Sequence, residues 1–298
     1  CECVKFQCHI LEEEMIPNDV VPGNTDVSIW DVIRPCCLTE REERELKAFT
    51  ESTGMTYLST PFSIAAVHRL GAMDVAAFKI GSGECNNYPL IREVASYGRP
   101  VILSTGMNDF DSIDRAVAVL DTAGVPFALL HCTSVYPTPH RLVRLGALGE
   151  MAARYPGVPI GLSDHSMGNY TCFAAVALGA SIVEKHFAST REWSGPDIGL
   201  SLEPHELGDL VAGTRAVFEA MGGTKGILPE EAPTIAFAYA SVVSLRTIEP
   251  GEALTRECIG VKRPGEGGIR AEHLDSLLGR RAARRIAGNR QVVPEDLE

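Results

Sequence analysis

Ile160-Gly-Leu-Ser-Asp-His165 and Ile182-Val-Glu-Lys-His186 are the two stretches that decide how this 298-residue chain folds. Each is a short apolar run typical of a buried strand, and each ends in polar residues at alternating positions. Residues i and i+2 of a strand project from the same face, so each stretch presents a histidine beside a hydroxyl or a carboxylate. Burying such groups costs free energy unless they are paired or bind a ligand. The pattern predicts a divalent metal ion held by His165 and His186, with hydrogen-bonded core histidines as the alternative.

Short apolar runs of this type recur along the first two thirds of the chain, and segments with helical periodicity separate them. The predicted strands are Cys3–Cys8, Thr56–Ser59, Ala76–Ile80, Val101–Ser104, Phe127–His131, Pro159–Ser163 and Ser181–His186. The predicted helices are Glu40–Thr53, Ile64–Leu70, Leu90–Tyr97, Asp109–Ala123, Leu142–Arg154, Tyr170–Ala177 and Pro204–Met221. Strands that alternate with helices in this way indicate a parallel sheet.

The fold class predicted from this alternation is α/β, and the architecture is a (β/α)8 TIM barrel. Seven strands fit a barrel that lacks its first βα unit better than they fit an open Rossmann sheet. The G-x-G-x-x-G motif of a dinucleotide-binding fold does not occur. The chain begins without Met, directly in the run Cys3–Cys8, so we expect that a preceding unit has been lost.

Polar side chains stand at the end of every predicted strand, where barrels of this type assemble their active sites. Each serine or threonine could instead cap a helix or a turn. Lys5 and Lys79 need another explanation, because a lysine inside an apolar strand requires a carboxylate partner or a ligand. Beside several hydroxyls, they predict a site for a phosphate and a carboxylate. The strand-end residues are Lys5, Gln7, Ser59, Thr60, Lys79, Ser82, Ser104, Thr105, His131, Thr133, Ser163, His165, Glu184 and His186.

The composition is that of an ordinary globular protein, with 45% hydrophobic residues and a formal net charge of −12. This charge argues against general nucleic-acid binding, which needs a basic face. The sequence contains no apolar run of transmembrane length and no recognisable signal peptide, so no membrane association is predicted. The nine cysteines are scattered and lack the spacing of a zinc site, which predicts reduced thiols in the cytoplasm.

The sequence pattern changes after Gly222, and the predicted domains are divided there. Residues 1–222 form the predicted barrel, residues 223–233 a linker, and residues 234–298 a compact β-rich domain. This domain opens with the predicted strand Ser241–Ile248 and is small for independent stability. Its glycine-rich loop carries Arg263, which is either a solvated surface charge or a guanidinium that reaches an active site.

Several long strings of residues are specific enough to identify a family. They are Pro22-Gly-Asn-Thr-Asp-Val-Ser28, Phe78-Lys-Ile-Gly-Ser-Gly-Glu-Cys-Asn-Asn-Tyr-Pro-Leu90, Leu103-Ser-Thr-Gly-Met-Asn108, Leu130-His-Cys-Thr133, Tyr136-Pro-Thr-Pro139, Gly161-Leu-Ser-Asp-His165 and Gly195-Pro-Asp197. Together they resemble the N-acetylneuraminate (sialic acid) synthase family of the NeuB type, over essentially the whole chain. The tail, with Val261-Lys-Arg-Pro-Gly265, is similar to the antifreeze-like (SAF) domain of that family.

The resemblance implies a synthase barrel followed by the SAF domain, paired as a domain-swapped homodimer in which the SAF domain of one chain covers the barrel mouth of the other. It implies a transferase of carbohydrate biosynthesis that condenses phosphoenolpyruvate with open-chain N-acetylmannosamine, adds water and releases phosphate to give sialic acid. A related nonulosonate synthase of the legionaminate or pseudaminate type, acting on a different N-acetylated hexose, is the alternative.

The resemblance also implies roles for individual residues. His165 and His186 would hold Mn²⁺ or Mg²⁺ and belong to the catalytic group, in which Glu184 and Glu84 are the candidates for moving protons. The residues that would bind phosphoenolpyruvate are Lys5, Thr60, Lys79, Ser82, Ser104, Ser134 and Ser163. The residues that would contact the sugar are Gln7, Asn24, Tyr136, Asp197 and, from the partner chain, Arg263.

Two departures from the family pattern bear on these roles. We expect that the family's first strand, which carries an acidic active-site residue, is missing, and Ser134 stands where close sialic acid synthases often carry Asn. The second departure leaves room for a related substrate. Interpretations of other classes are a metal-dependent aldolase or hydrolase on the same barrel, and an inactive fragment or non-catalytic sugar-binding protein.

Overall fold

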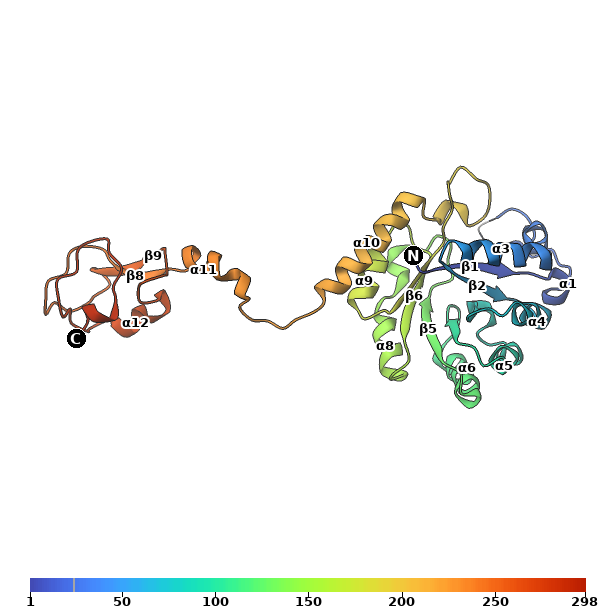
Figure 1. The fold of residues 1–298 in the computed structure, drawn as a ribbon, viewed down its shortest axis with the longest axis horizontal. Helices are drawn as coiled ribbons and strands as arrows, with labels where there is room; N and C mark the ends of the chain where they lie inside the picture. Colours follow the sequence, from blue (N-terminus) through green and yellow to red (C-terminus); the bar gives the residue numbers. More distant parts are fainter. Residues whose placement is uncertain (24) are drawn as a thin grey trace. The chain divides into compact units, whose positions relative to one another are not determined.

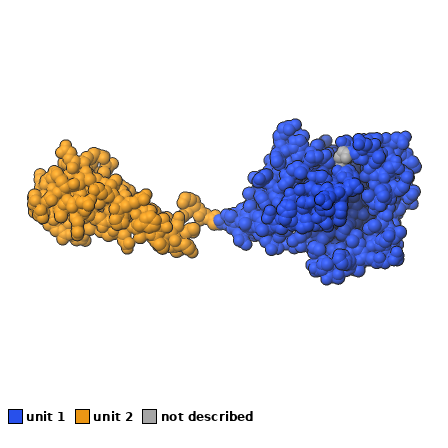
Figure 2. Space-filling view, turned by 90° about the horizontal axis from the view of Figure 1, so that it is seen from above, with its two compact units in different colours: residues 1–222 blue, residues 223–298 orange. Residues whose placement is uncertain are grey.

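The structure is a computed structural model, and it describes residues 1–23 and 25–298. The chain divides into two compact units, Cys1–Gly222 and Gly223–Glu298, which Figure 2 distinguishes by colour. Each unit has its own cluster of buried hydrophobic side chains. In the described part of the chain, none of the helices is both long enough and apolar enough to span a membrane.

The first unit contains a curled sheet of parallel strands with helices packed around its outside (Figure 1). The strands within the described residues are β1 (Cys3–Cys8), β2 (Thr56–Pro61), β3 (Phe78–Ile80), β4 (Val101–Ser104), β5 (Phe127–Cys132), β6 (Ile160–Asp164) and β7 (Ile182–Lys185). β1 pairs with β2, and β3 to β7 pair in sequential order, all in parallel. This arrangement confirms the predicted α/β architecture of the TIM-barrel type.

The helices of this unit follow the strands in alternation. They are α1 (Leu11–Glu14), α2 (Ile29–Ile33), α3 (Glu40–Ser52), α4 (Ile64–Ala72), α5 (Tyr88–Ser96), α6 (Phe110–Ala123), α7 (His140–Val143), α8 (Gly146–Arg154), α9 (Tyr170–Ala177) and α10 (Pro204–Ala220). The prediction of one helix over Leu142–Arg154 was wrong. Arg144 has a φ of 55°, in the left-handed region that cannot continue a right-handed helix, so α7 ends there and α8 starts afresh.

Alternation along the strands divides their side chains between two environments. Outward-facing residues such as Phe78, Leu103 and Leu162 are fully buried against the helices and form the hydrophobic core. Inward-facing residues include the polar groups of the predicted site. Gly161 on β6 must lack a side chain, because a Cβ there would lie 2.4 Å from the carbonyl oxygen of Ile182.

The second unit is small and mostly irregular. β8 (Ser241–Ser244) pairs antiparallel with β9 (Ile259–Lys262), so the strand predicted over Ser241–Ile248 is shorter than expected. The unit also contains α11 (Ala232–Ala238) and α12 (Leu274–Leu277). Its core is formed by aliphatic side chains from its strands and loops, among them Val242, Ile248 and Leu254.

Candidate active site

Three charged side chains from three strands meet on the inner face of the curled sheet. Lys5 Nζ of β1 lies 3.3 Å from Glu184 Oε1 of β7, and Lys79 Nζ of β3 lies 3.7 Å from Glu184 Oε2. The Lys79 side chain is only 2% exposed. Glu184 is therefore the carboxylate partner that buried lysines require. Because two ammonium groups share one carboxylate, the cluster retains a positive charge that suits an anionic ligand.

The protonation states of this cluster follow from burial and from the neighbouring charges. Burial alone would raise the pKa of Glu184, but the charges of Lys79 and Lys5 outweigh it and lower the pKa to about 2. Burial lowers the pKa of Lys79 to about 8, against the opposing attraction of Glu184. Glu184 is thus ionised at neutral pH and is a poor proton donor, whereas Lys79 keeps its proton at neutral pH and loses it at about pH 8.

Hydroxyl groups surround the charged cluster. Ser104 Oγ accepts a hydrogen bond of 2.7 Å from Lys79 Nζ, and Ser163 Oγ donates one of 3.1 Å to Glu184 Oε1. Thr60 Oγ1, at the end of β2, is buried and has no hydrogen-bond partner among the described residues. A buried hydroxyl without a partner is unfavourable, so its position here is consistent with a bound ligand.

Ser82 and Ser134 come together at Gly106, in the loop that follows β4. The Gly106 backbone N–H donates a hydrogen bond of 3.0 Å to Ser82 Oγ. A Cβ on Gly106 would lie 2.5 Å from Ser134 Oγ and 2.8 Å from Ser82 Oγ, so only glycine allows this approach. Cys132 Sγ lies 4.0 Å from Ser134 Oγ and 3.9 Å from His165 Nδ1. The serine pair therefore adjoins the histidines, and Cys132 is a neighbour that the sequence analysis did not identify.

His165 and His186 face one another at the ends of β6 and β7, with ring centroids 5.3 Å apart. The Tyr136 ring lies 4.1 Å from His165 and 6.2 Å from His186. His165 Nδ1 is 3.0 Å from the Thr133 carbonyl oxygen, which leaves Nε2 as the ligating nitrogen, as is usual for metal-binding histidines.

Burial lowers the pKa of His186 to about 4, so its ring is neutral and able to bind a metal. His186 Nδ1 lies 3.8 Å from Asp197 Oδ2. Two imidazole rings with a carboxylate beside them are groups that could hold one divalent cation.

A cavity of about 340 Å³ opens beside these residues. Three of the predicted site residues line it, namely Gln7, Glu84 and Asp197. Glu84 also accepts a hydrogen bond of 2.6 Å from Asn87 Nδ2. The remaining lining residues come mainly from α1, α2 and the loop between them and are largely apolar.

Two predicted sugar contacts cannot be placed with the others. Asn24 lies outside the described residues. Arg263 belongs to the second unit, where it is exposed and directly follows β9. Its assignment to the active site stays a prediction.

Some strand-end polar residues do not face the site, which corrects the expectation that all of them converge. Ser59 Oγ lies 3.4 Å from Glu43 Oε1 of α3, and His131 Nε2 lies 2.7 Å from the Val143 carbonyl oxygen of α7, so both point into the helical layer. Thr105 Oγ1 donates to the Leu130 carbonyl oxygen within the sheet. These three residues have structural partners.

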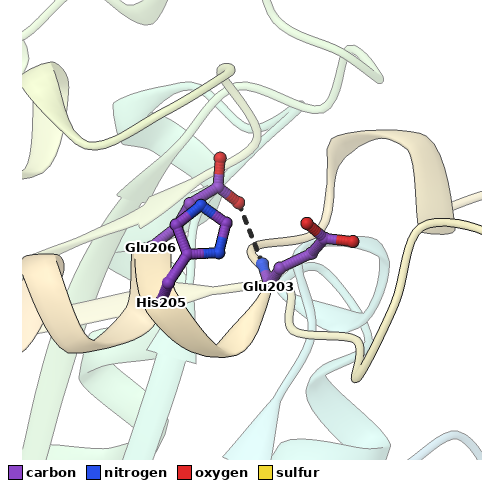
Figure 3. Close-up of side chains that lie close together, drawn as sticks. All are labelled: Glu203, His205 and Glu206. Carbon is purple, nitrogen blue, oxygen red and sulfur yellow. Dashed lines mark hydrogen bonds between the residues drawn. The ribbon is translucent and has the colours of Figure 1, made fainter.

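Glu203, His205 and Glu206 form a separate cluster at the start of α10 (Figure 3). They are the one set of three possible metal-donor groups lying within 4.8 Å of one another in the described chain. Glu206 Oε2 accepts a hydrogen bond of 2.9 Å from the Glu203 backbone N–H, which completes a capping box. The Arg191 guanidinium forms ion pairs with both carboxylates. The helix cap and this arginine account for the cluster without a metal ion.

The sequence matches the NeuB family over residues 1–226 and the SAF domain over residues 239–298. The chain belongs to the NeuB family. Among characterised relatives, N,N'-diacetyllegionaminic acid synthase of Campylobacter jejuni is 34% identical over 94% of this chain and 86% of its own length. Human N-acetylneuraminate-9-phosphate synthase is 31% identical over 99% of this chain and 84% of its own length.

A solved structure supports the same assignment. The N-acetylneuraminic acid (sialic acid) synthetase of Leptospira borgpetersenii, crystallised in complex with citrate, superimposes with a TM-score of 0.71. It is 31% identical, and the match covers 78% of this chain and 79% of that one. The chain therefore shares its fold and family with synthases whose named products differ.

Proposed function

We propose that this NeuB-family protein condenses phosphoenolpyruvate with an N-acetylated hexosamine and releases inorganic phosphate. The observation that carries the proposal is the cluster of Lys5, Lys79 and Glu184 on the same inner face as the pair of histidines. Phosphoenolpyruvate carries up to three negative charges near neutral pH, so it needs fixed cations and hydrogen-bond donors. Two lysines, the unpartnered hydroxyl of Thr60 and the serines at the strand ends supply them.

Each residue has a defined task in the proposed reaction. Lys5 and Lys79 hold the phosphate and carboxylate groups and orient the enol carbon toward the aldehyde carbon of the sugar. A carbon–carbon bond forms between the enol carbon and the aldehyde carbon, and water adds to the carbon that carries the phosphate oxygen. The bond from that carbon to the phosphate oxygen then breaks, so that the water oxygen becomes a keto oxygen. In the overall balance, one water proton ends on the former aldehyde oxygen and the other leaves with the phosphate. Glu184 is ionised and is a poor proton donor. Glu84 lines the neighbouring cavity and is the other carboxyl group proposed to move protons.

His165 and His186 would hold a divalent metal ion in this reaction. Imidazole nitrogens favour Mn²⁺ over Mg²⁺, because Mg²⁺ prefers oxygen ligands. When bound, the metal would polarise the sugar carbonyl and orient the two substrates. The protein contributes the fixed ring of His165, held through its hydrogen bond to Thr133, and the neutral ring of His186.

The cavity argues for an unphosphorylated sugar. Glu14, Glu84 and Asp197 line it, and no lysine or arginine of the described chain does. The lining that this chain provides offers a sugar phosphate no lysine or arginine, and phosphate recognition depends on such donors. N-acetylmannosamine without a phosphate group is therefore the proposed substrate, in contrast to the product for which the human relative is named.

A second candidate is a synthase of the legionaminate or pseudaminate type. The specific observation in its favour is the apolar lining of the cavity, which includes Met15, Ile29, Val32 and Phe62. Such a surface suits a second acetamido group or a deoxy carbon in place of a hydroxyl. Ser134, at a position where close sialic acid synthases often carry Asn, is consistent with a changed substrate.

The test is a measurement of phosphate release from phosphoenolpyruvate with three sugars, followed by mass spectrometry of the products. The sugars are N-acetylmannosamine, its 6-phosphate and a hexose with two acetamido groups. We expect turnover with one of the unphosphorylated sugars and at least tenfold less with the 6-phosphate. Absence of phosphate release with every sugar would refute the condensation, while preference for the 6-phosphate would refute only the argument from charge.

We also propose that the protein acts as a homodimer in which Arg263 of one chain serves the barrel of the other. The family assignment and the exposed position of Arg263 in a separate unit support this arrangement.

A further inference from the structure

His9 joins a predicted sugar contact to a buried carboxylate. It follows Gln7 at the next inward position of the chain, just after β1. His9 Nε2 lies 3.1 Å from Gln7 Oε1, and His9 Nδ1 lies 3.0 Å and 3.1 Å from the two carboxylate oxygens of Glu14. The side chains of His9 and Glu14 are only 5% and 4% exposed.

The surrounding structure fixes this chain of contacts. The short helix α1 folds back over the end of β1, and its buried residue Leu11 anchors it there. This return places Glu14 against the histidine. On its face, the His9 ring stacks on Phe62 with centroids 4.6 Å apart and an angle of 11° between the planes. His9 is therefore restrained along its edge by hydrogen bonds and across its face by packing.

The hydrogen bonds determine how the Gln7 amide is turned. The carboxylate oxygens of Glu14 lie against His9 Nδ1, and the amide oxygen of Gln7 lies against His9 Nε2, so each ring nitrogen faces an oxygen atom. Because the amide oxygen of Gln7 faces His9, its amide nitrogen is turned to the other side. Gln7, His9 and Glu14 all line the cavity that also contains Glu84 and Asp197.

We infer that His9 and Glu14 are positioning residues, which hold the Gln7 amide so that it presents an N–H donor to the sugar. Neither residue is assigned a contact with either substrate, and the lysine cluster that would bind phosphoenolpyruvate involves neither of them. The inference rests on the proposed function, because it specifies how one predicted contact of that site is prepared. It predicts that the sugar must offer a hydrogen-bond acceptor, such as a hydroxyl or an acyl oxygen, to Gln7.

The experiment is a double-mutant cycle in the full-length chain, with the KM measured separately for the two substrates. His9→Ala should raise the KM for the sugar about fivefold, which corresponds to the loss of one ordinary hydrogen bond, and leave the KM for phosphoenolpyruvate unchanged. In the Gln7→Ala background the same change should have almost no effect, because the amide that His9 holds is already absent.

Three further variants, Glu14→Gln, Glu14→Ala and His9→Gln, separate positioning from folding. Glu14→Gln keeps an oxygen that can accept from His9 and should have a smaller effect than Glu14→Ala. His9→Gln keeps an N–H donor and should restore part of the sugar affinity lost in His9→Ala. Glu13→Ala is the matched control, since Glu13 is exposed on the same short helix, and it should leave both KM values unchanged.

The possible outcomes distinguish this inference from the proposed function. Equal effects of His9→Ala with and without Gln7 would overturn the inference while leaving the proposed function intact. An equal rise in KM for both substrates, or no rescue by His9→Gln, would do the same. A wild-type protein that releases no phosphate with any sugar of the panel would remove the proposed function and this inference together.

Discussion

Asp164 and Lys185 form a buried ion pair on the outer face of the sheet, and each residue directly precedes a histidine of the candidate active site. The Lys185 Nζ lies 2.9 Å from Asp164 Oδ2, and the two residues are register partners on β6 and β7. Both side chains are at most 2% exposed. Because successive residues face opposite sides of a strand, this outer pair fixes the two strand ends that present His165 and His186 inward.

Removing the lysine alone should be strongly destabilising. Lys185→Met leaves the Asp164 carboxylate buried without its cation, which costs about 3–5 kcal/mol in typical cases. Denaturant unfolding measures the change in the free energy of unfolding. Asp164→Asn combined with Lys185→Met should recover most of the loss, because the amide can still accept hydrogen bonds from the hydroxyls of Ser166 and Thr171. A double variant as unstable as Lys185→Met would contradict this account.

Metal binding should depend on the two histidines and not on the cluster at the start of α10. His186→Ala should weaken Mn²⁺ binding at least tenfold, as measured by electron paramagnetic resonance of free Mn²⁺, and should abolish turnover. His205→Ala is the matched control, because it removes a histidine from the other group of donors and should leave both properties unchanged. Loss of Mn²⁺ binding in His205→Ala but not in His186→Ala would reverse the assignment.

The sequence predicted the elements well because strands and helices alternate with clear periodicity. It also identified the inward set, in which Lys5, Lys79 and Glu184 come together. The pairing of the two lysines with Glu184 was not predicted. β1 and β7 are far apart in the sequence, and the side chains of Lys5 and Glu184 meet only because the sheet curls. The alternation of side chains along β2 could have excluded Ser59 from the predicted site. Ser59 faces the opposite side of the strand from the inward-facing Thr60, and its hydroxyl contacts Glu43 of α3.

Other features of the structure could not be predicted from the local sequence pattern. The break at Arg144 depends on a left-handed backbone conformation at that residue, which the residue type does not indicate. The His9–Glu14 pair forms because α1 turns back over a strand end, which periodicity does not report. Such contacts are set by tertiary packing.

The affinity for phosphoenolpyruvate should fall at alkaline pH. The pKa of Lys79 is lowered from 10.5 to about 8, so its ammonium group is lost as the pH rises through about 8. The KM for phosphoenolpyruvate should therefore be flat near neutral pH and rise up to about tenfold per pH unit above 8. Glu184→Gln should shift this rise to lower pH, since the carboxylate helps to keep Lys79 protonated. A rise that stays in place or moves to higher pH would exclude this assignment.

The unpartnered hydroxyl of Thr60 should favour ligand binding at the expense of stability. Thr60→Val keeps the shape and removes a buried oxygen that has no partner among the described residues, so the free energy of unfolding should rise by about 1 kcal/mol. The same variant should raise the KM for phosphoenolpyruvate severalfold. Thr50→Val is the control, because Thr50 Oγ1 donates a hydrogen bond of 2.9 Å to the Leu46 carbonyl oxygen, and it should lower stability without changing the KM. A Thr60→Val protein with unchanged substrate affinity would argue that the hydroxyl has no role in binding.

Mixed dimers should show whether Arg263 acts on its own chain or on the partner. Arg263→Ala and Lys79→Ala should each be nearly inactive, the first through loss of a sugar contact and the second through loss of a phosphoenolpyruvate contact. If the second unit serves the other chain, a heterodimer of the two variants contains one barrel with Lys79 that is served by an intact Arg263. Co-expressed and doubly tagged heterodimers should then recover up to about half of the wild-type rate per dimer.

A mixture of Lys79→Ala with Lys5→Ala is the control, because both changes damage the same lysine cluster. In the exchanged arrangement each barrel of that control still lacks one lysine, so its rate should stay low. Heterodimers of the first pair that remain inactive would show that each second unit serves its own barrel.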